Sequence, residues 1–379
     1  MEQRPDPIPL FEISWDENDI TTVADSIKRG GFWAKGPYID QLESKLEEFM
    51  NVNSALVVNS GTTALVAALH GLEIDEGDEV IVPAFTFIAT ANAVRLVGAE
   101  PVFADIEPDT YGLDPTSVED NLSESTAAII PVHPYGTSCR IDELVELAAD
   151  HDIPLIEDAA EVLGAEFGGQ KLGSFGDAAA LSFCQNKIVP AGEGGAVITD
   201  DEELAKEVKL YRSHGRASSD YFGSSGSGEY VDLGTNIRMS DLTAALGCSQ
   251  FNRIDDLIDG RRQAANRLHD HFAGVDDVRP HTSSEMGTHV YQLYTIELAE
   301  EINRNHVIET LDDHNISSKV YWDPPVHQTE YYTQTKNETP DLPVTEDITS
   351  RVLSLPMYPN LSRTETDRIA DAVIEAVDQ

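Results

Sequence analysis

The chain has 379 residues, 41% of them hydrophobic, so it is long enough to form one large domain and one smaller domain around buried cores. Its 68 acidic and 25 basic residues give a formal net charge of −43, which argues against nucleic-acid binding. No segment approaches the roughly 20 apolar residues of a membrane span, and three widely spaced cysteines suit neither a disulfide framework nor a zinc site.

The excess negative charge is spread along the whole chain and does not form an acidic tail. Such a surface destabilises the compact state by self-repulsion unless salt screens it. We therefore favour a halophilic protein over an ordinary acidic bacterial one. The first ten residues contain three prolines and no apolar stretch that could serve as a signal sequence, so we expect a cytoplasmic location and no membrane partner.

Short β-rich runs alternate with helical segments through the first half of the chain. The runs are continuously apolar, as in strands buried on both faces, and the alternation predicts an α/β domain with a mostly parallel sheet covered by helices. The predicted helices 62–72 and 142–149 have one apolar face each. The predicted strands are 55–58, 79–82, 101–106, 127–132, 154–156, 178–183 and 195–198.

The composition changes in the second half of the chain. Residues 215–234 are rich in glycine and serine, which is typical of a mobile surface loop. After Asn252 a long charged helix is predicted, followed by a smaller α/β unit that ends in a helix over 365–377. We therefore predict a large domain over residues 1–250, including an N-terminal arm, and a small C-terminal domain over 251–379.

The stretch 59–65, Asn-Ser-Gly-Thr-Thr-Ala-Leu, follows a predicted strand and opens a predicted helix. Ser60 can cap that helix, and the amides of Gly61 and Thr62 can then bind an anion in the favourable field at the helix N-terminus. A plain helix cap is the more common meaning of such a sequence, so this stretch alone does not establish a phosphate site.

Two motifs place reactive groups at the ends of strands. Asp158 follows the predicted strand 154–156, where open α/β sheets bind ligands, and its carboxylate can pair with the pyridinium nitrogen of pyridoxal phosphate. A helix cap or a metal ligand is the alternative, although no histidine cluster lies nearby. Lys187 ends the sequence Ser-Phe-Cys-Gln-Asn-Lys after another strand, and desolvation would suit it to imine chemistry. An ordinary exposed lysine is the alternative.

In the stretch 83–90, Pro-Ala-Phe-Thr-Phe-Ile-Ala-Thr, two aromatic rings flank a threonine where a strand ends. One ring can stack on a planar heterocycle while the other fills the core, although core filling by both is more common. In their order along the chain, the four motifs fit one cofactor better than four unrelated structural roles.

This order of motifs resembles the DegT/DnrJ family of sugar aminotransferases, which are fold type I enzymes that depend on pyridoxal 5'-phosphate. The similarity runs from about Trp15 to the C-terminus and includes residues 60–62, 85–87, 157–160, 182–187 with 192–195, 235–239 and 353–356. It implies transfer of an amino group, expected from glutamate, to a nucleotide-linked keto-hexose for glycan biosynthesis. A 4-keto sugar is favoured, and a 3-keto sugar is the alternative.

The resemblance also implies roles for the matching residues around the cofactor ring. Lys187 would form the Schiff base with the cofactor and later shuttle the proton. Asp158 would hold the pyridine nitrogen, and Phe87 would stack on the ring. Glu161 departs from the family, which usually has glutamine or histidine near the phenolic oxygen. Because an ionised carboxylate would repel a phenolate there, we expect Glu161 either to be protonated or to point elsewhere.

Further residues would bind the phosphate and the sugar. The phosphate ligands implied by the resemblance are Gly61, Thr62, Ser182 and, from the second subunit of a homodimer, Asn236. Trp33 and His327 lie in stretches that approach the sugar in the family. As alternatives, Asn236 is a turn residue, Trp33 is a packed aromatic side chain and His327 is a surface histidine.

Three competing functions are less consistent with the sequence. In the dehydratase branch of the family a histidine replaces the Schiff-base lysine, whereas this chain has Lys187. A desulfurase would need a cysteine on a mobile loop over the cofactor, and residues 215–234 contain none. The presence of both Asp158 and Lys187 argues against a regulator that keeps the fold without catalysis.

Overall fold

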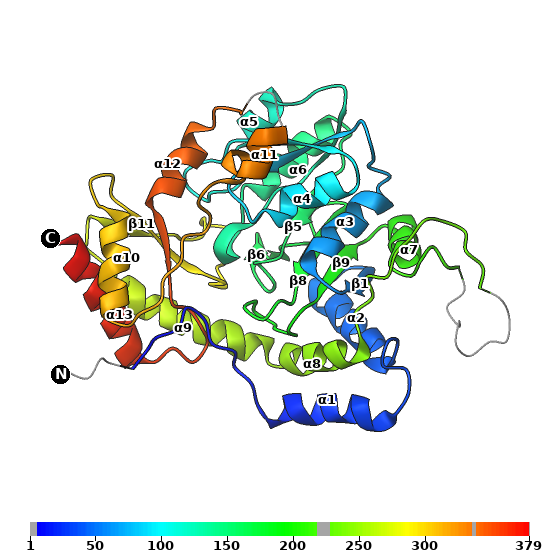
Figure 1. Cartoon of the computed structure of the whole chain (residues 1–379), viewed down its shortest axis with the longest axis horizontal. Coiled ribbons are helices and arrows are strands. Elements are labelled where there is room, and N and C mark those ends of the chain that lie inside the picture. Colours follow the sequence, from blue (N-terminus) through cyan, green and yellow to red (C-terminus); the bar gives the residue numbers. More distant parts are fainter. Residues whose placement is uncertain (1–5, 218–227, 336–338, 379) are drawn as a thin grey trace.

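The computed structural model describes residues 6–217, 228–335 and 339–378. Much of the predicted loop 215–234 therefore lies outside the described residues. Figure 1 shows a central sheet with helices around it, most of the C-terminal unit in yellow to red on the left, and α1 (Glu17–Arg29) along the bottom. The orange helices α11 (Glu330–Thr335) and α12 (Pro343–Arg351) lie at the top. Among the described residues, no helix is both long enough and apolar enough to cross a bilayer.

The central sheet of the described chain contains seven strands in two hydrogen-bonded groups, β1-β9-β8-β5 and β3-β2-β4. Parallel bridges from Ile129 to Leu155 and from Val132 to Asp158 join β4 to β5, so the groups form one sheet. The predicted mostly parallel sheet is confirmed. The strands are β1 (Ser54–Val58), β2 (Glu79–Pro83), β3 (Glu100–Ala104), β4 (Thr126–Ile129), β5 (Ile156–Asp158), β8 (Ala178–Ser182) and β9 (Gly195–Thr199).

β9 is the exception, because it runs antiparallel to both β1 and β8. A parallel connection needs a crossover, usually a helix, and no helix lies between β8 and β9 in the described structure. The chain instead turns back through the segment that contains Lys187.

Both faces of the sheet are covered, as the apolar strands predict. Along β1, Ala55 and Val57 join one core cluster, while Leu56 and Val58 join a second cluster on the other face. Helices α2, α6 and α8 contribute to the first cluster, and α3, α4 and α7 to the second. The helices of this part are α2 (Pro37–Met50), α3 (Gly61–Gly71), α4 (Ala89–Leu96), α5 (Pro115–Asp120), α6 (Ile141–Asp150), α7 (Glu202–Tyr211) and α8 (Asp241–Phe251).

The C-terminal unit has its own core and an antiparallel sheet in the order β10-β11-β12. Ile8 belongs to this core and forms a parallel bridge with Ile316, so the N-terminal segment lies beside the C-terminal unit. The predicted boundary near residue 250 falls in the last turn of α8 (Asp241–Phe251), just before α9, and stays a prediction. The elements are α9 (Ile254–Phe272), β10 (Val278–Pro280), β11 (Tyr294–Leu298), α10 (Arg304–Asp313), α11 (Glu330–Thr335), α12 (Pro343–Arg351), β12 (Val352–Leu355) and α13 (Arg363–Val377).

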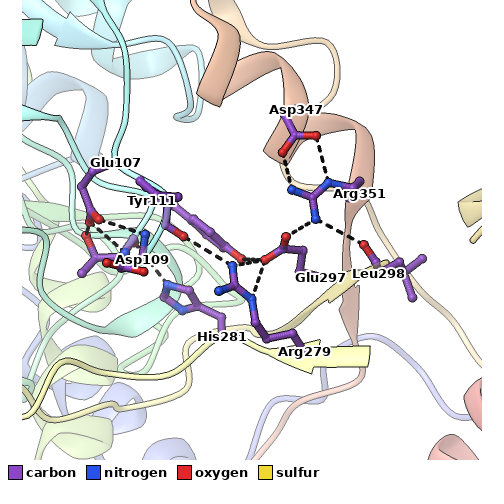
Figure 2. A network of polar contacts seen from close by, with 11 residues as sticks. Glu107, Asp109, Tyr111, Arg279, His281, Glu297, Leu298, Asp347 and Arg351 are labelled. Atoms are coloured by element: carbon purple, nitrogen blue, oxygen red, sulfur yellow. Dashed lines mark hydrogen bonds and ion pairs between the residues drawn. The ribbon is translucent and has the colours of Figure 1, made fainter. Parts of the chain in front are cut away.

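A polar network joins the C-terminal unit to the segment that follows β3 (Figure 2). Its centre is Glu297 on β11, which is 6% exposed and accepts a hydrogen bond from Tyr111 Oη at 2.8 Å. Arg279 on β10 donates from Nε to Glu297 at 2.8 Å, and Arg351 at the end of α12 pairs with the same carboxylate. Arg351 also pairs with Asp347, and the buried Glu297 carboxylate is held by residues from three places in the chain.

Candidate active site

The first part of the site lies at the carboxyl end of β5, where Asp158 is the last residue of the strand and is buried. Its backbone amide donates to the Pro131 carbonyl at 2.8 Å. Its carboxylate accepts hydrogen bonds from Thr90 Oγ1 at 2.8 Å and from the Ala160 amide at 3.3 Å. Burial raises the pKa of Asp158, while these hydrogen bonds and the charge of Lys187 act in the opposite direction. The fixed carboxylate retains acceptor capacity for a further donor.

Lys187 and Glu161 form the second part. Lys187 Nζ lies 3.1 Å from Glu161 Oε1, and the two side chains are only 14% and 13% exposed. Glu161 Oε2 accepts a hydrogen bond from the Tyr135 amide at 2.9 Å. Glu161 therefore faces into the site as the ion-pair partner of the lysine, and does not point elsewhere. Lys187 is accordingly not an ordinary exposed lysine.

The third part is the N-terminus of α3. Ser60 Oγ accepts a hydrogen bond from the Thr63 amide at 3.1 Å, which confirms the predicted cap. The amides of Gly61 and Thr62 have no partner one turn earlier in the helix, as in any first turn. A Cβ atom at Gly61 would lie 3.0 Å from Ser182 Cβ and 3.3 Å from Ser182 Oγ, so only glycine fits comfortably there. Helix amides and a serine hydroxyl thus border one small space that suits a phosphate group.

The two aromatic residues after β2 have different surroundings. Phe85 is fully buried and contacts the rings of Tyr111, Tyr135 and Trp322. Phe87 is 59% exposed. The expectation that one ring fills the core while the other is available is confirmed, whereas the stacking of Phe87 on a cofactor stays a prediction.

Asn236 and Trp33 are both accessible in the single chain. Asn236 is exposed on an extended segment that precedes α8, and its backbone bridges to Ser213. Trp33 is 49% exposed, and its Nε1 donates to the Ser26 carbonyl at 3.2 Å. Within the described part of one chain, neither side chain hydrogen-bonds to Lys187 or Asp158, so their roles at a second subunit and at the sugar stay predictions.

His327 is 2% exposed, so the alternative of a surface histidine is wrong. Its Nε2 lies 3.3 Å from Glu346 Oε1, and its ring lies near that of Phe103. Burial lowers the pKa of His327. Pro325 and Val326, which precede His327, do not form a pattern from which the burial of this side chain could have been predicted. Contact of His327 with a sugar stays a prediction.

Sequence reasoning missed the residues that position the reactive groups. Thr90 lies in the stretch 83–90, but the sequence predicts no role for it because its partner Asp158 is 68 positions away. Tyr135, which holds Glu161 through its backbone amide, carries no side-chain signal for that contact. Gln292 donates to the Asn186 carbonyl at 2.7 Å and so supports the segment before Lys187. None of these long-range contacts has a local signature.

Asp158 ends β5, Lys187 follows the neighbouring parallel strand β8, and the capped N-terminus of α3 borders Ser182 at the end of β8. The residues present therefore fit pyridoxal phosphate: a carboxylate for the ring nitrogen, a lysine for its aldehyde and a nest of donors for its phosphate. With the sheet described above, this arrangement defines a pyridoxal-phosphate-dependent aminotransferase of fold type I.

The family model of the DegT/DnrJ/EryC1/StrS aminotransferase family matches residues 14–374, and the chain belongs to this family. It is 35% identical over 368 residues to the GDP-perosamine synthase of Caulobacter vibrioides, covering 96% of this chain and 95% of the relative. It is 37% identical over 333 residues to a UDP-N-acetyl-3-dehydro-alpha-D-glucosamine 3-aminotransferase of Acidithiobacillus ferrooxidans, covering 88% and 86%.

A solved relative has the same fold along nearly its whole length. A sugar aminotransferase described as putative, from Streptococcus pneumoniae and solved in its PMP form, superposes with a TM-score of 0.92 at 29% identity, covering 98% of each chain. The same protein has been solved in a PLP form. The family, the fold type and the cofactor implied by the sequence motifs are therefore confirmed.

Proposed function

We propose that this sugar aminotransferase transfers an amino group from glutamate to a nucleotide-linked 4-keto-hexose for glycan biosynthesis. The observation that carries the proposal is the pairing of Lys187 with Glu161 beside the buried Asp158, because this arrangement retains both groups that transamination requires. The names of the two relatives support a nucleotide-linked substrate, since one contains GDP and the other UDP.

In this proposal, pyridoxal phosphate supplies an electron-withdrawing ring when it is bound. Asp158 holds a proton on the ring nitrogen, because its carboxylate is fixed by Thr90 and the Ala160 amide. Lys187 Nζ moves the proton at the carbon that bears the amino group, and Glu161 Oε1 orients this nitrogen. The helix amides at Gly61 and Thr62, with Ser182, hold the phosphate.

Amination of a 3-keto sugar is the second candidate. The relative from Acidithiobacillus ferrooxidans is named for a 3-dehydro sugar, and it matches this chain at 37% identity. The preference for the 4-keto sugar rests on the family resemblance. Discrimination between the two depends on a few pocket contacts of about 1–3 kcal/mol each.

The test is to incubate purified protein with glutamate and a panel of 3-keto and 4-keto nucleotide sugars and to identify the products by mass spectrometry. Amino sugars are expected from the 4-keto substrates. Products only from 3-keto substrates would favour the second candidate, and no product from any of them would contradict a nucleotide-sugar substrate. Lys187→Ala serves as the inactive control, and borohydride reduction with peptide mapping should locate the cofactor on Lys187 in the wild type.

The proposal extends to the setting of the enzyme. We expect a cytoplasmic homodimer in which Asn236 completes the phosphate site of the other subunit. The net charge of −43 supports the proposal that the protein works in high salt.

A further inference from the structure

One short segment of the C-terminal unit, residues 290–293 before β11, is connected by hydrogen bonds to both partners of the Lys187–Glu161 ion pair. One path leads from this segment to the backbone at Lys187, and the other leads to the carboxylate of Glu161. Both paths cross from the C-terminal unit to the large sheet. We call residues 290–293 the bridging segment.

The path to Lys187 passes through the peptide group between Asn186 and Lys187. Gln292 Nε2 donates to the carbonyl oxygen of this peptide at 2.7 Å, and the amide of the same peptide donates to the Cys184 carbonyl at 2.9 Å. The peptide plane is therefore held at both of its polar atoms. Gln292 is 2% exposed, so little water competes for the bond. A side chain of the C-terminal unit thus fixes the backbone from which the lysine extends.

The path to Glu161 passes through Tyr135. The Leu293 amide donates to the Tyr135 carbonyl at 3.1 Å, and the Tyr135 amide donates to Glu161 Oε2 at 2.9 Å. A further bond runs from the Val290 amide to the Gly136 carbonyl at 2.9 Å. The bridging segment therefore also holds the loop that orients the carboxylate.

The contact between the bridging segment and the loop at Tyr135 is close and strained. Tyr135 has a φ of 61° and Tyr291 a φ of 50°, in the left-handed region that residues other than glycine rarely adopt. A Cβ atom at Gly136 would lie 2.7 Å from the backbone nitrogen of Gln292, so only glycine fits there. Strain of this kind persists where the surrounding structure enforces it, and it is concentrated at functional sites.

The bridging segment is itself held by Arg261 on α9. The guanidinium donates from Nη1 to the Tyr291 carbonyl at 3.0 Å and to the Gln292 carbonyl at 3.3 Å. Arg261 is 3% exposed, and burial lowers the pKa of its guanidinium to about 10. Because these carbonyls are bound to a buried cation, the segment is fixed in place and is not a free loop.

We propose that Gln292 is a positioning residue for transamination and that, through the peptide before Lys187, it keeps the nitrogen of that lysine beside Glu161. The inference rests on the proposed role of Lys187 as the Schiff-base lysine. With the backbone on both sides of the ion pair held by one segment, only side-chain torsions can separate the two charges. A displacement of about 1 Å at a reactive group can cost about a hundredfold in rate, so such control has a large effect.

The test measures the pH midpoint of the absorbance of the bound cofactor in Gln292→Met holoenzyme. Methionine fills a similar space but cannot donate to the Asn186 carbonyl, so the lysine nitrogen should lie beside Glu161 for less of the time. We expect the midpoint to move to lower pH by about half a unit, in the direction expected for loss of the Glu161 charge. The glutamate half-reaction should slow by about tenfold.

Gln250→Met is the matched control. Gln250 is 1% exposed, and its Nε2 donates to the Ser14 carbonyl at 3.1 Å and to Asp19 Oδ2 at 2.7 Å, outside the bridging segment. This variant loses a buried glutamine of the same size, and its midpoint should equal that of wild type. An equal shift in both variants would show general loosening and overturn the proposal. Melting temperatures establish folding, and Gln292→Asn, one methylene shorter, replaces Gln292→Met if the latter does not fold.

A double variant separates positioning from packing. In Glu161→Gln the carboxylate charge is already gone, so adding Gln292→Met should move the midpoint no further. Additive shifts would overturn the proposal, as would an unmoved midpoint in Gln292→Met alone. Borohydride reduction with peptide mapping shows separately which lysine binds the cofactor. A cofactor on a lysine other than Lys187 would contradict the proposed function, so the two failures are distinguishable.

Discussion

The charged residues of the site are restrained in two different ways. Lys187 and Glu161 form an ion pair, whereas Asp158 is buried among neutral donors. Burial raises the pKa of Asp158. At a pH just above the ordinary pKa of an aspartate, its ionised form is therefore less favoured in the folded chain than in the unfolded chain. A cationic ring nitrogen beside it would remove this cost, so cofactor binding should also stabilise the fold.

We expect Asp158→Asn to keep the cofactor but to lower transamination by several orders of magnitude. A neutral amide cannot hold the ring-nitrogen proton that makes the ring electron-withdrawing. Single-turnover absorbance with glutamate gives the rate, and cofactor content is measured in parallel. A rate within tenfold of wild type, a change of only about 1.4 kcal/mol in the barrier, would rule out the assigned role.

For Glu161→Gln, we expect the pH midpoint of the absorbance of the bound cofactor to move to lower pH by about one unit or more. The amide keeps the shape of the side chain and can still accept from the Tyr135 amide, but the negative charge beside Lys187 Nζ is lost. Glu166→Gln removes the carboxylate that pairs with Lys171 and should leave the midpoint unchanged. Equal midpoints in both variants would show that Glu161 acts only through packing.

At the scale of elements, the strands of the large sheet could be predicted because each is a continuous apolar run. The start of β5 could not be predicted in this way. Pro154 belongs to the apolar run but has no amide to donate, and pairing with β8 begins only at Ile156. The directions and contacts of β10–β12 also escaped prediction. Glu297 illustrates why: a glutamate in a strand reads as solvent-facing, and its three cationic and phenolic partners come from distant segments.

The network around Glu297 should contribute to stability (Figure 2). Glu297→Gln leaves Arg351 and Tyr111 without their carboxylate, and we expect a loss of about 2–3 kcal/mol in the free energy of unfolding. This is below the ~3–5 kcal/mol of a fully buried pair because Arg279 reaches solvent. Chemical denaturation gives the value, and exposed Glu300→Gln is the control.

The same network makes part of the stability dependent on pH. Burial raises the pKa of Glu297, but the hydrogen bonds from Tyr111 and Arg279 outweigh it, so the pKa is lowered. A lowered carboxyl pKa gives stability that is present above the ordinary value and lost as the pH falls through the folded value. The melting temperatures of wild type and Glu297→Gln should therefore converge below about pH 4, from the ordinary glutamate value. A difference between them that stays constant as the pH falls further below that value would contradict the assignment.

At the scale of the whole molecule, the acidic surface dominates. With a net charge of −43, we expect the melting temperature to rise by several degrees from low to molar potassium chloride, because screening weakens self-repulsion. An uncharged osmolyte at equal osmolality is the control for general exclusion effects. A flat or falling melting temperature in salt would contradict a halophilic protein.

The proposed homodimer is tested by mixing Lys187→Ala and Asn236→Asp subunits. A two-fold interface is self-complementary, so in the heterodimer the site with Lys187 intact receives Asn236 from the Lys187→Ala subunit. One native site is restored, and activity should exceed that of either parent. If exchange is demonstrated and Asn236→Asp alone is defective, absence of recovery would place Asn236 in its own subunit's site or outside it.

The bridge between Ile8 and Ile316 also affects how the chain is made. A polypeptide is synthesised from its N-terminus at roughly 5–20 residues per second. About 300 residues, which take some tens of seconds, are therefore added after Ile8 before its partner Ile316 is made. The sheet strands β1 to β9 are all synthesised within that interval. The reactive residues can thus be gathered while the first segment is still unpaired, and Ile8 can join the core of the C-terminal unit only after Ile316 has been synthesised.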